Sequence, residues 1–159
     1  MAPRIWQVID NAPVVTAVTH KDADGDTLGS ALALALALEP IGKSVPVVSS
    51  PPVPQAWWFL PGFERVNQQS APPDTPVFIF DASDASRAGA YAAAVAQAKV
   101  VVNIDHHVSN KQFGSINLVR TEAVPTFKRD IADAYEKATG LPPQIFVTPA
   151  TEGAGKVQE

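Results

Sequence analysis

Short apolar runs alternate along this chain with longer amphipathic or alanine-rich segments. Runs of four to seven residues rich in β-branched side chains are typical of buried strands, and they occur at 14–19, 43–49, 77–80, 100–104 and 116–119. Helix-forming segments lie around and between them, at 5–11, 27–39, 88–99 and 127–139. Because strands alternate with helices, the pattern predicts an α/β fold with a mainly parallel sheet flanked by helices.

One segment breaks this alternation. Residues 50–75 contain several prolines, among them Pro51, Pro52 and Pro54, which exclude a long regular element. The same segment carries the aromatic pair Trp57 and Trp58. We therefore expect a linker-like excursion between the second and third strands.

Composition narrows the functional classes. The chain has no cysteine, which excludes a disulfide scaffold, a zinc ribbon and a cysteine nucleophile. No apolar run approaches the roughly 18 residues of a membrane span, and no signal-peptide core follows Met1, so a cytoplasmic protein without membrane contact is expected. A net charge of −4 without a basic stripe argues against nonspecific binding to long nucleic acid.

Polar clusters follow three of the predicted strands. The side chains are His20, Asp24, Asp26, Asp81, Asp105, His106 and His107. Since ligands bind beyond the carboxyl ends of parallel strands, these side chains are expected to share one crevice. Taken singly, each cluster has a structural explanation: a turn with Asp26 as the N-cap of the next helix, a turn aspartate, and an exposed histidine pair.

Taken together, the clusters favour metal binding. Several carboxylates in one crevice would raise one another's pKa, and a divalent cation removes that penalty. Mixed carboxylate and imidazole ligands suit Mn²⁺ or another first-row ion better than Mg²⁺. Two such ions about 3.5–4 Å apart, bridged by one carboxylate, would suit phosphoester hydrolysis.

The order and spacing of the clusters resemble the first three motifs of the DHH phosphoesterase family. The matching residues are His20-x-x-x-Asp24-Gly25-Asp26, Asp81 with Ser83-Asp84-x-x-Arg87, and Asp105-His106-His107. Residues 103–119 further resemble the branch that contains nano-RNases and 3′-phosphoadenosine-5′-phosphate phosphatases. The resemblance covers about residues 10–119 and implies the N-terminal, catalytic lobe of that family.

The resemblance implies a dinuclear manganese site. Asp81 would bridge the two ions. His20 and Asp24 would bind one ion, and Asp26 and His106 would bind the other.

It also implies roles for three further residues. Asp105 would be a supporting carboxylate. His107 would face the scissile phosphate, where it would stabilise charge or protonate the leaving oxygen. Arg87 would contact substrate or hold its loop, and a surface salt bridge is the alternative explanation for it.

After about residue 119 the chain departs from the family pattern. The region expected to carry a fourth-motif aspartate, 148–156, has only Glu152 as an acidic residue. We therefore expect a DHH-type core at 1–119, a divergent helix and tail at 120–159, and no second, substrate-binding lobe in this chain. An apolar surface near Trp57 and Trp58 would favour a homodimer, and the alternative is that both rings pack under the proline-rich loop.

The expected function is metal-dependent hydrolysis of short oligonucleotides or nucleotide phosphates, impaired by the missing fourth motif and second lobe. One alternative is a catalytically silent metal- or nucleotide-binding domain derived from the same family. Another is a plain α/β domain whose strand-end acids are caps. A nicotinamide-binding domain is disfavoured, because residues 24–29 lack the necessary glycine spacing.

Overall fold

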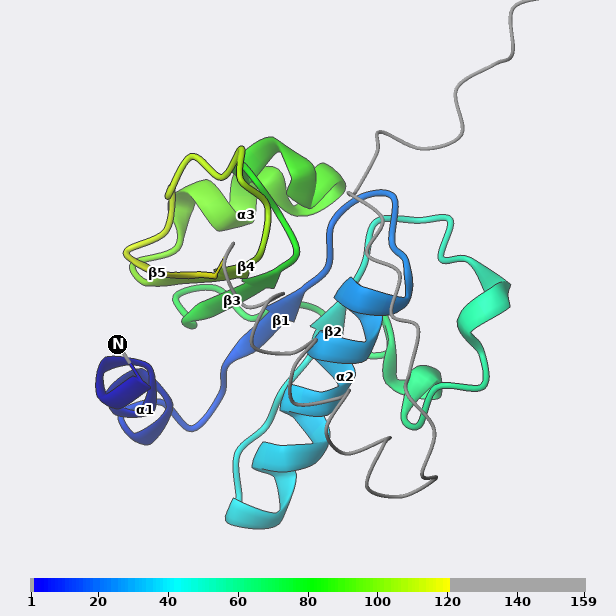
Figure 1. The fold of residues 1–159 in the computed structure, drawn as a ribbon. Coiled ribbons are helices and arrows are strands. Elements are labelled where there is room, and N and C mark those ends of the chain that lie inside the picture. Colours follow the sequence, from blue (N-terminus) through cyan, green and yellow to red (C-terminus); the bar gives the residue numbers. More distant parts are fainter. Residues whose placement is uncertain (1, 121–159) are drawn as a thin grey trace, which may run out of the picture. The chain divides into compact units, whose positions relative to one another are not determined.

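Five parallel strands form the centre of the structure, in the spatial order β2-β1-β3-β4-β5 (Figure 1). The computed structural model describes residues 2–120. The strands are β1 (Thr16–Val18), β2 (Val47–Val48), β3 (Val77–Phe80), β4 (Val101–Asp105) and β5 (Ile116–Val119). The predicted α/β fold with a mainly parallel sheet flanked by helices is confirmed.

Helices cover both faces of this sheet. Helices α1 (Ala2–Asp10) and α2 (Gly25–Leu38) lie below the sheet in Figure 1, and α3 (Ala92–Gln97) lies above it. The described residues include no helix of the length and apolarity that crossing a membrane requires.

The pleat of β3 explains why a strand between two helical layers is apolar throughout. Phe78 and Phe80 belong to the core cluster that contains the buried residues of α2, while Val77 and Ile79 belong to the cluster that contains Val95 of α3. Successive side chains of a strand point to opposite faces, so a strand covered on both faces needs apolar residues at every position.

Three predicted elements are shorter than expected, and the first is the strand 14–19, which is reduced to β1. The predicted strand 43–49 is reduced to β2, with an isolated bridge between Val14 and Ser44 before it. Pro46 lies between bridge and strand, and it has no N–H for the ladder.

The predicted helix 88–99 is divided at Gly89. A 3₁₀ segment, Ala85–Tyr91, precedes α3, and Gly89 within it has a φ of 57°. A Cβ at Gly89 would lie only 2.4 Å from Ser50 Oγ, so the helix-breaking backbone leaves room for a close contact with the neighbouring loop.

The proline-rich excursion contains two 3₁₀ turns, Gln55–Trp57 and Phe63–Arg65. Trp57 is half-buried against the core cluster below the sheet, whereas Trp58 is 70% exposed. The expectation that both rings pack under the loop is therefore wrong for Trp58. The predicted helix 127–139 and the region 148–156 lie outside the described residues.

Candidate metal centre

The direction of the strand order reverses between β1 and β3. The chain runs outward from β1 to β2 and then returns to β3 on the other side of β1, and ligands of doubly wound sheets bind at such a switch point. His20 follows β1 closely, Asp81 follows β3 directly, and Asp105 is the last residue of β4. The topology alone thus brings these residues to one edge of the sheet.

Asp81 lies at the centre of this edge, and three imidazoles surround its carboxylate. His20 Nε2 lies 3.4 Å from Asp81 Oδ2. His106 Nε2 lies 3.0 Å from Oδ1, and His107 Nδ1 lies 3.4 Å from the same oxygen. The structure therefore brings together side chains from three clusters that are separated by up to 87 positions in the sequence, from His20 to His107.

The backbone of Asp81 is in an uncommon conformation. Its φ is +56°, in the left-handed region that aspartate tolerates better than most residues. Its N–H donates to the carbonyl oxygen of Ile104 at 2.9 Å, which ties the end of β3 to β4. Residues held in this way cluster at functional sites, because the surrounding structure must stabilise the strained backbone.

The surroundings of Asp81 favour its ionised form. Burial raises the pKa of this carboxyl group, but the His20 hydrogen bond and the nearby His107, His106 and His20 charges together hold the pKa below its usual range. A buried carboxylate that remains charged is suited to bind a cation.

The first cluster shows one correction. Asp24, not Asp26, is the N-cap of α2: its Oδ1 accepts the N–H groups of Asp26 and Thr27 at 3.1 and 3.2 Å. Asp26 lies within the first helical turn and is exposed. Thr27 Oγ1 accepts the His20 N–H and donates to the Phe80 carbonyl oxygen, which holds the first turn of α2 against the ends of β1 and β3.

Two overlapping groups of side chains could hold metal ions. One group is His20, Asp24 and Asp81, and the other is Asp81, His106 and His107; within each, the ligand atoms lie within 4.8 Å of one another. Asp81 belongs to both groups, as a bridging carboxylate would. Asp26 is not in the second group, but it lines a cavity of about 280 Å³ together with Asp81 and His106.

The hydrogen bonding of these groups is compatible with a bound cation. His20 Nδ1 and Asp81 Oδ1 are buried, and among residues 2–120 neither has a well-aligned hydrogen-bond partner; His106 Nε2 approaches Asp81 Oδ1 to 3.0 Å as an ion pair only. A buried carboxylate oxygen without an aligned donor is costly, and a cation among the imidazoles would satisfy it. The donor set of carboxylate oxygen and imidazole nitrogen fits a first-row divalent ion.

A second layer of polar residues orients His107. The Asp105 side chain is buried, and its Oδ1 lies 2.7 Å from His107 Nδ1. Asn110 donates to the other Asp105 oxygen and, at 3.1 Å, to the carbonyl oxygen of Ala82. A carboxylate at Nδ1 favours the tautomer that carries its proton there, which leaves Nε2 of His107 as an acceptor.

The sequence analysis assigned no role to Asn103 or Asn110. Asn103 is fully buried in β4, and its side chain donates to the same Ala82 carbonyl oxygen at 3.0 Å. An amide among the apolar residues of a buried strand is a sequence signal for such a contact, because a buried polar group needs a partner; the Asn103 side-chain oxygen has none among the described residues.

Arg87 forms the salt bridge that was the alternative explanation for it. Its Nη1 lies 3.4 Å from Asp22 Oδ2, and its carbonyl oxygen accepts the N–H of Lys21 at 2.6 Å. Arg87 therefore connects the loop after β3 to the loop after β1.

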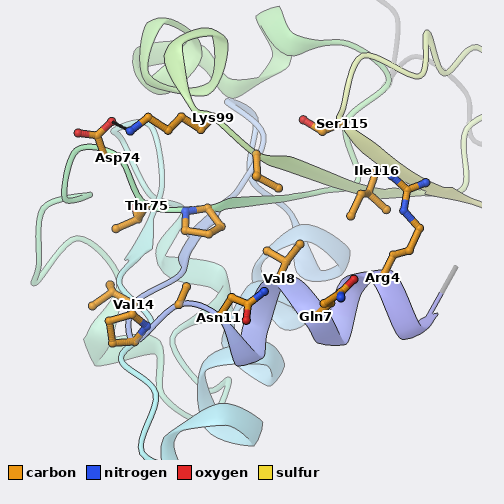
Figure 2. A pocket seen from close by; sticks show the side chains of 14 residues that line it. Arg4, Gln7, Val8, Asn11, Val14, Asp74, Thr75, Lys99, Ser115 and Ile116 are labelled. Atoms are coloured by element: carbon orange, nitrogen blue, oxygen red, sulfur yellow. Dashed lines mark ion pairs between the residues drawn. The ribbon is translucent and has the colours of Figure 1, made fainter.

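A larger cavity, of about 650 Å³, lies near the beginnings of the strands (Figure 2). Side chains of α1 line one side of it, and Asp74 and Lys99, paired at 3.1 Å, lie on the other. None of the predicted site residues lines this cavity. Cavity size and the predicted chemistry therefore favour different edges of the sheet. The convergence of possible ligand atoms is the stronger indicator of a metal-binding site.

The fold and this site are those of a DHH-type domain. The chain belongs to the DHH family, because the sequence model of that family's N-terminal domain matches residues 14–134. The chain is 33% identical over 143 residues to the bifunctional oligoribonuclease and PAP phosphatase NrnA of Thermus thermophilus, covering 82% of this chain and 42% of that protein. It thus spans less than half the length of this relative.

Two further similarities are more limited. An exopolyphosphatase-related protein from Bacteroides fragilis has a similar crystal structure, with a TM-score of 0.64 and 22% identity over 76% of this chain and 38% of its own, which shows the shared fold. A galactokinase from a Roseiflexus species is 40% identical over 45 residues, which is 28% of this chain and 12% of that enzyme.

Proposed function

We propose that this domain hydrolyses phosphoester bonds of short oligonucleotides or nucleotide phosphates with the help of divalent metal ions. Membership of the DHH family and the similarity to an oligoribonuclease and PAP phosphatase support the reaction class. The observation that carries the proposal is the Asp81 carboxylate, which belongs to two groups of candidate ligands.

His20 and Asp24 would hold one ion, Asp26 and His106 the other, and Asp81 would bridge them. Mn²⁺ is the proposed ion, because it accepts both carboxylate and imidazole ligands. When bound, the ions would supply an activated water and neutralise the phosphate oxygens.

The remaining residues would act on the substrate or position other groups. His107 would face the scissile phosphate through Nε2, since Nδ1 lies against Asp105; it would stabilise charge there or, when both ring nitrogens carry a proton, donate the Nε2 proton to the leaving oxygen. Asp105 would be a positioning residue. Arg87 would reach a substrate phosphate only by leaving Asp22, so we assign it first to holding the two loops together.

The test combines metal binding with hydrolysis. Metal-free protein is titrated calorimetrically with Mn²⁺, and release of mononucleotide from a short 5′-phosphorylated RNA is then followed, for the wild type and Asp81→Asn. Two equivalents of metal, together with hydrolysis that the variant loses, is the expected result. Metal binding without hydrolysis would favour a silent metal-binding domain, and absence of both would leave a plain α/β domain.

A further inference from the structure

Two exposed aromatic side chains lie in the segment next to the candidate metal centre. Trp58 is 70% exposed and Phe59 is 61% exposed. Trp57, directly before them, packs against the core cluster and anchors this part of the loop. An anchored backbone that presents large apolar rings to solvent is typical of a binding surface.

Trp57 connects the segment that carries these rings to the metal centre. A Cβ on Gly25 would lie 3.0 Å from Trp57 Cζ3, so the indole ring lies directly against the Gly25 backbone. Gly25 separates the candidate ligands Asp24 and Asp26. Phe59 packs at a tilt against Trp57, with ring centroids 6.2 Å apart, so the Phe59 ring lies beside the indole ring that contacts Gly25.

The electrostatics of this segment favour an uncharged flat group over a phosphate. Glu64 and Arg65 are the only charged residues between positions 50 and 70. Arg65 is engaged by Glu39 at 2.9 Å and by Glu64 at 4.0 Å. The segment therefore offers π faces beside the site rather than an accessible positive charge.

We propose that Trp58 and Phe59 form a stacking platform for a nucleobase of the substrate whose phosphate lies at the metal centre. This inference rests on the proposed function and adds the part of the substrate that is recognised. Stacking tolerates any sequence because every base has a π face, so the platform suits short oligonucleotides of mixed sequence.

The size of the surface favours a base over a second copy of the chain. An aromatic side chain buries about 150–250 Å². Two such rings fall short of the roughly 800 Å² that each partner of a stable complex contributes.

The experiment compares substitutions of Trp58 on two substrates. The substrates are a 5′-phosphorylated adenine dinucleotide and the same molecule with abasic sugars. Trp58→Ala is expected to raise KM for the dinucleotide about tenfold, equivalent to about 1.4 kcal/mol, with kcat unchanged. Trp58→Phe should stay close to the wild type because it keeps a π face, and Trp58→Leu should behave like alanine.

Trp6 supplies the matched control. It is a half-exposed tryptophan on α1, the helix that lines the cavity of Figure 2, and Trp6→Ala should leave both substrates unaffected. None of the Trp58 variants should change KM for the abasic substrate. If Trp58→Leu retains wild-type KM, the contact is merely apolar and the stacking proposal is overturned.

Equilibrium binding of the dinucleotide separates this proposal from the proposed function. Hydrolysis by the wild type with unchanged KM in Trp58→Ala would overturn the platform and leave the phosphoesterase standing. Base-dependent loss of binding in a protein without turnover would support the platform and contradict the phosphoesterase. If Trp58→Ala converts a dimer to a monomer in light scattering and KM is unchanged, the rings are an interface between copies.

Discussion

Both edges of the sheet carry an aspartate with a left-handed backbone, but their chemistry differs. At the carboxyl edge, a buried carboxylate lies within 3.0–3.4 Å of nitrogen atoms of three histidines. At the amino edge, the larger cavity has its acidic residue, Asp74, paired with Lys99 at the surface (Figure 2). The larger cavity and the buried polar atoms without an aligned hydrogen-bond partner thus lie at different edges, so the size of a cavity and the chemistry of its surroundings are separate criteria for a ligand site.

Asp81 and Asp74 make the contrast specific. Both have left-handed backbones, with φ of 56° and 63°. The Asp81 side chain is 11% exposed and the Asp74 side chain is 72% exposed. The two aspartates therefore share an unusual backbone, and burial among possible ligands is what distinguishes Asp81 from Asp74.

The largest expected effect comes from exchanging these two aspartates for asparagine. Asparagine also tolerates the left-handed region, so both variants should fold. Asp81→Asn should weaken Mn²⁺ binding by about 100-fold or more, because removing even an outer partner of a ligand costs 10–100-fold. Asp74→Asn should bind Mn²⁺ like the wild type in calorimetry.

Thermal unfolding checks the same comparison independently. Mn²⁺ at 100 times its Kd should stabilise the wild type and Asp74→Asn by about 2.7 kcal/mol for each ion bound, and the same concentration should stabilise Asp81→Asn by less than about 0.5 kcal/mol. Equal stabilisation of all three proteins would contradict the assignment of Asp81.

The next effect concerns asparagines at the two edges. Asn110→Ala removes the donor that holds Asp105, and kcat should fall about tenfold while Mn²⁺ affinity is unchanged. Asn11→Ala, in the amino-edge cavity, should change neither. The ¹⁵N shifts of the His107 ring report the tautomer without turnover, and an unaltered tautomer in Asn110→Ala would contradict the positioning role.

A smaller effect separates the two roles of Asp24. In metal-free protein, Asp24→Ala should lower the free energy of unfolding by about 1 kcal/mol because α2 loses its N-cap. Asp24→Asn should cost much less, since asparagine is an equally good cap, yet both variants should weaken Mn²⁺ binding. Chemical denaturation with and without Mn²⁺ measures both quantities, and full Mn²⁺ affinity in Asp24→Asn would exclude Asp24 as a ligand.

The smallest effect is a pH dependence at Asp84, on the loop after β3. Hydrogen bonds from the Ser86 hydroxyl and N–H, with a contribution from Lys111, lower the pKa of this carboxyl group despite some desolvation. A lowered folded-state pKa contributes stability above the unfolded value of about 3.9, and that stability is lost as pH falls through the folded value.

The wild type should therefore lose more stability than Asp84→Ala when the pH is lowered from 6 to 3. The difference should stay below about 1 kcal/mol, because an exposed group is screened by solvent. Denaturant unfolding at both pH values provides the measurement. Identical losses in the two proteins would show that these hydrogen bonds do not favour the charged form.

Much of the fold was predictable because local sequence patterns indicate its strands and helices. The apolar run at 77–80 is the whole of β3, and the alternation of strands with helices predicted a parallel sheet. The same rule placed the polar clusters at one edge. An error occurred where two local solutions were equally good: Asp24 and Asp26 are both able to cap a helix, and in the structure Asp24 accepts the N–H groups of Asp26 and Thr27.

The sequence by itself determined which residues reach the carboxyl edge, because strand order along the chain and the motif residues that follow each strand are local properties. Only the tertiary structure decided which atoms meet there: both oxygens of Asp81 facing three imidazoles, Asn110 holding Asp105, and Gly89 making room for Ser50. These contacts join segments far apart in the chain. They depend on strand register and loop packing, to which the propensity of each segment contributes little.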